Sequence, residues 1–229
     1  MAAHSTPRAV LLDALGTLIS FEPPAPRLRL ALRERLGIDV GAAAAEAAIR
    51  AEISYYRVHL HEGRDAAALA DLRARCADAM RPALPVHAST ELLTEALLDA
   101  LRFFAYPDAA PALQALRAAG IRTVVVSNWD HSLHERLAET GLASLVDGAV
   151  ASAEAGAAKP ERAIFEAALA LAGTRDAWHV GDTVAADVDG ALAAGLTPVL
   201  IARHEEPAMP DGVTVIESLA ELIPLALSR

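Results

Sequence analysis

The chain has 229 residues, a formal net charge of −10 at pH 7 and an apolar fraction of 54%. This length can bury one sizeable core together with a small appended domain, and the apolar content excludes a disordered chain. The negative charge argues against nonspecific binding to nucleic acid. The sequence has no uninterrupted run of about 18 apolar residues, so we expect no membrane partner.

Two features bear on the cellular compartment. The first eight residues are polar and short before the first apolar run, which is not typical of a signal peptide. Cys76 is the only cysteine, so the chain can form no internal disulfide, and we interpret it as a structural residue. We therefore expect a cytoplasmic location.

The first motif is a carboxylate at the end of an apolar run. Residues 9–12 are apolar and the segment is closed by Gly16, which predicts a buried strand with Asp13 at its carboxyl end. Ligands bind at the carboxyl ends of strands in open α/β sheets. Leu15 stands two residues on, so a candidate nucleophile is present without a second acid. Taken alone, Asp13 could equally cap a turn.

The second motif follows a β-branched run over residues 123–127. Ser127 ends this run and Asn128 follows it, before a helix predicted to begin near His131. A hydroxyl and an amide at this place could hold an anion. The alternative is that Ser127 or Asp130 is an ordinary helix N-cap.

The third motif is a lysine beside a proline. We expect Pro160 in the first turn of a helix that carries Ile164, Phe165 and Leu169. Lys159 then lies just before a helix N-terminus. A lone lysine is usually a solvated surface residue, but this chain is rich in arginine and has few lysines, which gives the position more weight.

The fourth motif is a pair of acids after a strand-like run near Val180. Gly181 and Asp182 end this run, and Asp187 follows five residues after Asp182. With Asp13, three acids from separate strand ends would converge. Clustered carboxylates raise one another's pKa unless a cation joins them, which predicts a hard, oxygen-seeking ion such as Mg²⁺. A helix-start carboxylate is the alternative for Asp187.

In their order along nearly the whole chain, these four segments resemble those of the haloacid dehalogenase (HAD) superfamily of hydrolases and phosphotransferases. The resemblance implies that Asp13 is the nucleophile and forms a covalent aspartyl intermediate. It also implies that Ser127, with Asn128, binds the transferred group and that Lys159 stabilises it. The substrate would be a small molecule, and the protein a monomer or homodimer.

The resemblance further implies that Mg²⁺ is the cofactor. Its ligands would be the side chains of Asp13 and Asp182 and the main-chain carbonyl of Leu15, because the family uses the backbone at that position. Asp187 matches the less constant last acid of the fourth motif and completes the predicted metal set.

Leu15 departs from the pattern of the family's phosphatases. They carry a second Asp at this position, which protonates the leaving oxygen and later activates water. General acid–base catalysis contributes about 10²–10⁴-fold to the rate, so its loss should lower the rate most for alkyl phosphates. The rate should fall least for acyl phosphates, aryl phosphates and halides.

The 2-haloacid dehalogenases also have a non-acid at this place, and they need no proton donor for halide. They use a Ser/Asn-containing motif where this chain has Gly181 and Asp182, and they work without metal. They would also need an arginine to receive the halide and the substrate carboxylate, in the early part of the domain that the family inserts after the first motif. The candidates are Arg29, Arg33, Arg35 and Arg50. We therefore predict a Mg²⁺-dependent, phosphatase-like hydrolase, with a dehalogenase or a catalytically weak ligand-binding protein as alternatives.

The apolar runs predict the fold class. They lie near Val10, Val125, Ala149, Val180, Val199 and Val215. Helical patterns separate them, and this alternation is typical of an α/β fold with a doubly wound parallel sheet. The resemblance implies a Rossmann-like core domain over residues 1–20 and 105–229.

Residues 21–104 show no strand pattern between helical segments, which predicts a helical insert. In the resemblance this insert is the cap domain, which closes over the site and selects substrates. We expect its hinges near residues 21–24 and 104–107.

Overall fold

The computed structural model describes residues 6–85, 87–203 and 212–227, so most of the stretch compared with a signal peptide lies outside the described residues. The chain divides into two compact units. The sheet unit comprises Met1–Ser20 and Ala105–Arg229, and the helical unit is Phe21–Phe104. Among the described residues, no helix combines the length and the apolar character needed to cross a bilayer.

In its described part, the sheet unit forms a six-stranded parallel sheet with the order β5-β4-β1-β6-β7-β8. The strands are β1 Ala9–Leu12, β4 Arg122–Ser127, β5 Gly148–Ala151, β6 Ala177–Gly181, β7 Thr197–Ile201 and β8 Thr214–Ile216. Every predicted apolar run is one of these strands. The predicted α/β class with a doubly wound parallel sheet is therefore confirmed.

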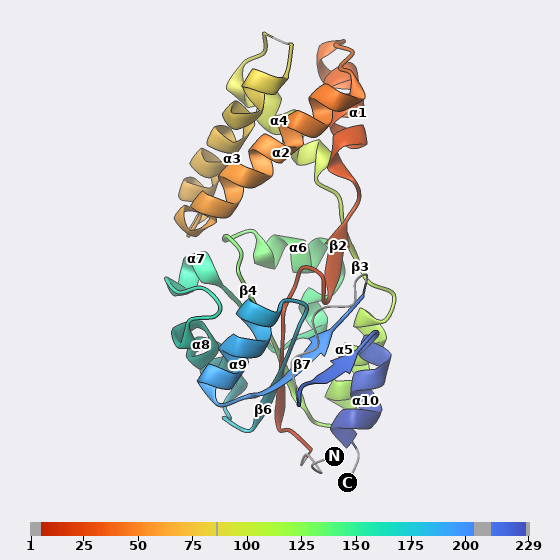
Figure 1. Ribbon diagram of the computed structural model, residues 1–229, viewed down its shortest axis with the longest axis vertical. Helices are drawn as coiled ribbons and strands as arrows, with labels where there is room; N and C mark the ends of the chain where they lie inside the picture. The colour runs from red at the N-terminus through yellow and green to blue at the C-terminus, as the bar shows by residue number, and fades with distance from the viewer. Residues whose placement is uncertain (1–5, 86, 204–211, 228–229) are drawn as a thin grey trace. The chain divides into compact units, whose positions relative to one another are not determined.

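Helices cover both faces of this sheet. They are α5 Ala109–Ala118, α6 Leu133–Glu139, α7 Ser152–Ala155, α8 Arg162–Ala172, α9 Asp189–Ala194 and α10 Leu219–Leu227. Figure 1 shows α8 and α9 on one side of the strands and α5 and α10 on the other. The central strand β1 is fully buried between these layers, which explains its unbroken apolar sequence.

Two predicted helix starts differ from the structure. The helix expected near His131 begins at Leu133. Pro160 is not in the first turn of α8, which begins at Arg162 with Glu161 as its N-cap. The backbone N–H of Glu161 donates to the carbonyl of Ala158 at 2.7 Å, and this closed turn holds Pro160 ahead of the helix.

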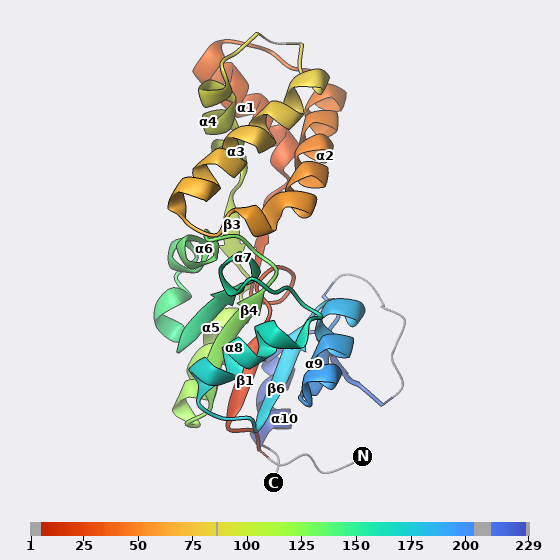
Figure 2. The ribbon, with the colours of Figure 1, turned by 90° about the vertical axis from the view of Figure 1, so that its left-hand side faces the viewer.

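Four α-helices make up most of the described helical unit (Figure 2). They are α1 Pro24–Leu36, α2 Ala42–His59, α3 Ala66–Met80 and α4 Thr90–Ala100. α1 packs against α4 and α2 packs against α3. Asp65 and Ser89 cap α3 and α4, since each side chain accepts a backbone N–H of the first turn.

The chain passes between the units through two short strands that pair with each other. They are β2 Ile19–Phe21 and β3 Phe103–Ala105. From the sequence we expect hinges near these segments and no strands. Runs of three residues carry too few side chains for an alternating pattern to be recognised.

Candidate active site

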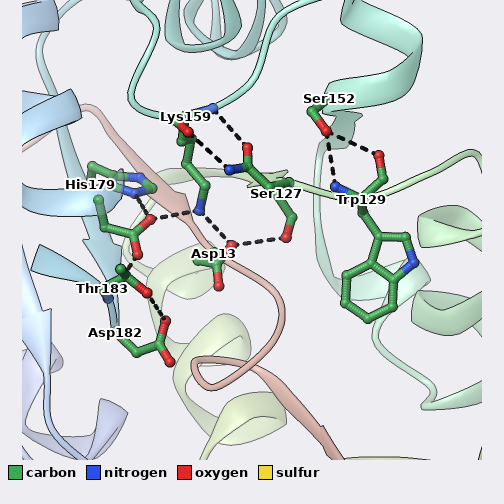
Figure 3. Close-up of polar contacts among 10 residues, drawn as sticks. Asp13, Ser127, Trp129, Ser152, Lys159, His179, Asp182 and Thr183 are labelled. Atoms are coloured by element: carbon green, nitrogen blue, oxygen red, sulfur yellow. Dashed lines mark hydrogen bonds and ion pairs between the residues drawn. The ribbon is translucent and has the colours of Figure 1, made fainter. Parts of the chain in front are cut away.

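Three of the predicted site residues lie at the carboxyl ends of neighbouring strands of the sheet unit (Figure 3). Asp13 follows β1, Ser127 ends β4 and Asp182 follows β6. β1 pairs with β4 on one side and with β6 on the other. The strands of this sheet that follow β1 in the chain are therefore added first on one side of it and then on the other, and Asp13 lies at this switch point. Ligands bind at such switch points in α/β sheets.

Asp13 is buried and is held through one oxygen. Its Oδ1 accepts hydrogen bonds from Ser127 Oγ at 2.9 Å and from Lys159 Nζ at 2.5 Å. Its Oδ2 accepts none from the described residues, so this oxygen is available for other chemistry. Burial raises the pKa of the Asp13 carboxyl, and the ammonium of Lys159 acts in the opposite direction. These contacts are not those of a turn cap.

Lys159 is the only lysine of the chain, and its side chain is buried between two carboxylates. Nζ donates to Asp13 Oδ1 at 2.5 Å and to Asp187 Oδ1 at 2.6 Å. Burial alone would lower the pKa of Lys159, but the two carboxylates outweigh it and raise the pKa. The ammonium is therefore a fixed positive charge beside Asp13.

Asn128 makes contacts that position Lys159. Its Nδ2 donates to the Lys159 carbonyl at 2.9 Å, and its Oδ1 accepts the Lys159 backbone N–H at 2.7 Å. Both ends of the carboxamide thus bind the backbone of the residue that approaches Asp13. Anion binding by Asn128 stays a prediction.

Asp187 is buried within a π-helix, Val184–Val188, and both of its oxygens accept hydrogen bonds. Oδ2 accepts the backbone N–H of Thr183 at 2.9 Å, and Asp187 lies in the first turn of the π-helix, as its helix-start alternative states. Oδ1 accepts from Lys159 Nζ and from His179 Nε2, the latter at 2.9 Å. Burial opposes ionisation, but Lys159 and His179 together hold the pKa of Asp187 well below its usual range.

His179 is the site residue that the sequence analysis missed. It lies in β6 and is fully buried, two residues before Gly181. The available signal was an imidazole inside a strand whose other residues are apolar or glycine. Strand periodicity alone does not show what such a side chain contacts.

Asp182 approaches the backbone of Gly16 closely. A Cβ at Gly16 would lie 2.0 Å from Asp182 Oδ2, and Gly16 has a φ of 81°. Both facts require glycine at this turn. Burial, followed by the charges of Asp13 and Asp187, raises the pKa of Asp182 to about 6.

Three acids form a candidate cation site. Oxygens of Asp13, Asp182 and Asp187 all lie within 4.8 Å of one another. They come from two strand ends, because Asp182 and Asp187 both follow β6, and the expectation of separate strand ends is wrong for this pair. Three carboxylates against the single ammonium of Lys159 leave an excess of two negative charges. The hard oxygen donors and this excess both fit a divalent ion such as Mg²⁺.

Two other sequence alternatives are decided by local contacts. Asp130 Oδ1 accepts the backbone N–H of Ser132 at 2.7 Å, but Ser132 is the N-cap of α6, so the N-cap alternative for Asp130 is wrong. Ser127 instead binds Asp13. Leu15 is 38% exposed, and ligation by its main-chain carbonyl stays a prediction.

Comparison with known proteins agrees with this geometry. A family model described as haloacid dehalogenase-like hydrolase matches residues 7–195. The "HAD phosphatase from Thermococcus onnurineus" has a similar structure, with a TM-score of 0.63, 27% identity, and coverage of 94% of this chain and 95% of that chain. A 2-haloacid dehalogenase from Pseudomonas syringae shares the fold at 24% identity and a TM-score of 0.64, covering 95% and 97% of the two chains.

Curated relatives match in part of their length. Haloacid dehalogenase-like hydrolase domain-containing protein 3 of Bos taurus is 37% identical over 119 residues, which are 49% of this chain and 47% of the relative. The pyrimidine 5'-nucleotidase YjjG of Escherichia coli is 35% identical over 139 residues, 57% and 61% of the two chains. The chain spans about half the length of the first of these relatives. Because the family model covers most of the chain, this protein belongs to the haloacid dehalogenase-like hydrolases.

Proposed function

We propose that the protein is a Mg²⁺-dependent phosphatase for a small phosphorylated metabolite, with Asp13 as the nucleophile. One observation carries the proposal. Asp13 is fixed through Oδ1 by Ser127 and Lys159, while Oδ2 is left for a substrate beside two further carboxylates. The phosphatase and nucleotidase relatives support this choice of chemistry.

The reaction follows from these positions. Asp13 Oδ2 attacks phosphorus, an O–P bond forms, and the bond from phosphorus to the leaving oxygen breaks with its electron pair. Water then cleaves the aspartyl phosphate, which releases inorganic phosphate and restores the carboxylate. Lys159 keeps its positive charge beside Asp13 throughout and offsets the charge of the phosphoryl oxygens.

The acids Asp13, Asp182 and Asp187 would hold the cation, with Leu15 contributing its carbonyl. When bound, Mg²⁺ supplies the positive charge that lets a phosphoryl dianion approach three carboxylates. The chain's own charges make this necessary, because one buried ammonium does not balance the acids.

Leu15 narrows the substrate class. Its side chain is partly exposed two residues after Asp13, and leucine cannot donate a proton. Substrates whose leaving oxygen departs readily as an anion, such as acyl and aryl phosphates, suit this site best. We also propose that the helical unit, inserted between β1 and β4 in the chain, is the cap that selects among them.

Dehalogenation is the second candidate, because halide departs without a proton and Leu15 supplies none. Two observations weigh against it. The acid cluster suits a metal that such chemistry does not need. Each early arginine proposed as a halide receptor also has a partner: Arg29 with the Val40 carbonyl, Arg33 with Asp39, Arg35 with Glu95 and Asp99, and Arg50 with Glu46.

Initial rates on three substrates separate the candidates. Acetyl phosphate, p-nitrophenyl phosphate and a 2-haloacid are each tested with Mg²⁺ and with EDTA, and Asp13→Asn is the blank. We expect phosphate release that needs Mg²⁺ and falls by at least about 10⁴-fold in Asp13→Asn. Metal-independent halide release would establish the dehalogenase. Phosphate release that persists in Asp13→Asn would remove Asp13 as the nucleophile, and no turnover of any substrate would favour a ligand-binding protein.

The role of Leu15 has its own test. Leu15→Asp should raise turnover of an alkyl phosphate by about 10- to 100-fold, because the new carboxyl can protonate the leaving oxygen. Leu15→Asn is the matched control, since it has the same shape without the acid. Equal rates for the two variants would contradict the leaving-group argument.

A further inference from the structure

His179 is buried without an evident packing reason for being polar. It is 0% exposed in the middle of β6, and the edge of Phe165 lies against its ring at a centroid distance of 5.1 Å. Nε2 lies 2.9 Å from Asp187 Oδ1, whereas Nδ1 is buried without a hydrogen-bond partner among the described residues. An apolar ring would fill this place without leaving a buried nitrogen unpaired.

The surroundings of the two ring nitrogens of His179 decide which nitrogen carries the proton. The partner of Nε2 is a carboxylate oxygen, which only accepts, so Nε2 is the donor. A proton on Nδ1 would be a buried N–H without an acceptor among the described residues, which is unfavourable. The Nε2–H of His179 therefore points at Asp187.

The strand provides the space for this contact. Residues 179 and 181 project to the same face of β6, because side chains alternate along a strand. A Cβ at Gly181 would lie 2.1 Å from Cγ of Asp187. The absence of a side chain at Gly181 thus lets the Asp187 carboxylate lie against the strand, within reach of His179.

The hydrogen bonds continue from there to the nucleophile. Asp187 Oδ1 accepts from both His179 Nε2 and Lys159 Nζ. Lys159 Nζ donates onward to Asp13 Oδ1 (Figure 3). Each contact is between buried groups. The orientation of the Asp187 carboxylate therefore sets where the ammonium lies relative to Asp13.

We propose that His179 is a positioning residue for the reaction: its Nε2–H holds Asp187 in the orientation that places Lys159 against Asp13. The proposal rests on the proposed function of Asp13 and Lys159. It assigns a role to a residue outside the four motifs, and it explains why β6 accepts an imidazole in an otherwise apolar core.

Three substitutions separate the hydrogen bond from the bulk of the ring. In His179→Gln the side-chain amide nitrogen reaches about the place of Nε2, whereas in His179→Asn it reaches only about that of Nδ1. His179→Phe keeps the ring without a donor. We expect His179→Gln to keep kcat within about 3-fold of the parent, and the other two to lower kcat by about 10- to 100-fold, as is typical for outer partners of a reactive group.

A second measurement does not depend on turnover. Because Lys159 is the only lysine, ¹⁵N-lysine labelling gives a single side-chain ammonium signal in the NMR spectrum. We expect the parent and His179→Gln to show the same signal, and His179→Asn and His179→Phe to show it shifted or lost. If no substrate is hydrolysed, the proposed function fails, while this signal still tests the positioning.

The proposal is overturned if the ammonium signal is the same in all four proteins. It is also overturned if His179→Gln is as slow as His179→Phe while both unfold at the parent temperature, because a donor at the Nε2 position would then be irrelevant. A rescue seen only with glutamine is a result that a purely structural role of the ring does not produce.

Discussion

Asp187 in the sheet unit and Glu52 in the helical unit are both buried, and burial has opposite outcomes for their pKa values. In the sheet unit, Asp187 receives hydrogen bonds from Lys159, His179 and the backbone of Thr183, and its pKa lies well below the usual range. In the helical unit, Glu52 lies on the buried face of α2. Burial raises its pKa to about 7, and the hydrogen bond from the thiol of Cys76 offsets this only in part.

Both carboxylates lose their hydration, so the number and charge of their donors make the difference. Asp187 remains ionised because a cation and two further donors replace water, and that charge in turn holds Lys159. Among the described residues, Glu52 has only the thiol of Cys76 to offset its burial, and it is neutral through most of the acid range. Burial alone therefore does not decide whether a carboxylate keeps its charge, because the donors around it do.

The largest expected effect comes from removing the cation of the sheet unit. Lys159→Met should lower the free energy of unfolding by about 3–5 kcal/mol, because two buried carboxylates lose their partner. Chemical denaturation followed by tryptophan fluorescence measures this, since Trp129 and Trp178 both lie in the sheet unit. The loss should be smaller at pH 5 than at pH 8, because protonation would make these carboxylates neutral, as Glu52 is.

The control for this variant is an exposed ion pair of the same unit. Arg175 binds Glu166 at the surface, and its replacement by methionine should leave the unfolding transition unchanged. If Lys159→Met were as stable as the parent at pH 8, the buried carboxylates would not need the ammonium, and the contrast with Glu52 would collapse.

The sequence predicts the fold better than it predicts the polar contacts. Strands buried on both faces, such as β1, appear as unbroken apolar runs, and their alternation with helices predicts a parallel, doubly wound sheet. Asp13, Ser127 and Asp182 meet because the carboxyl ends of neighbouring parallel strands share one edge of the sheet.

The partners of His179, Asn128 and Glu52 could not be predicted in this way. Each depends on a side chain from a distant segment: His179 meets Asp187 only because a π-helix turns back over Gly181. Glu52 falls on the apolar stripe of α2, where helical periodicity predicts burial but not its single thiol donor. Spacing along one element does not encode contacts between elements.

A smaller effect on stability is expected from Glu52, the buried carboxylate of the helical unit. The pKa of Glu52 is about 7 in the folded state, above its ordinary value of 4.5. The folded state therefore binds more protons between these values, and stability falls as pH rises through them. The free energy of unfolding should fall by about 3 kcal/mol, with the full decrease above about pH 7 and none below about pH 4.5. Glu52→Gln should remove this pH dependence.

Amide hydrogen exchange of α2 at pH 5 and pH 8, corrected for intrinsic rates, measures this pH dependence in the helix that carries Glu52. Glu46→Gln, on the exposed side of the same helix, is the matched control and should keep the parent's pH dependence. An unchanged dependence in Glu52→Gln would show that another group carries it.

The smallest effect comes from a single methyl group beside the acids of the sheet unit. Gly16 and Gly156 both have positive φ, at 81° and 66°, but a Cβ would strike Asp182 only at Gly16 and meets nothing within 4 Å at Gly156. Both alanine variants pay the backbone strain of about 1–2 kcal/mol. Gly16→Ala alone must also move an acid of the cluster, so Mg²⁺ affinity measured by calorimetry should fall about 10-fold relative to Gly156→Ala. Equal affinities would mean that Asp182 is not a ligand in its present position.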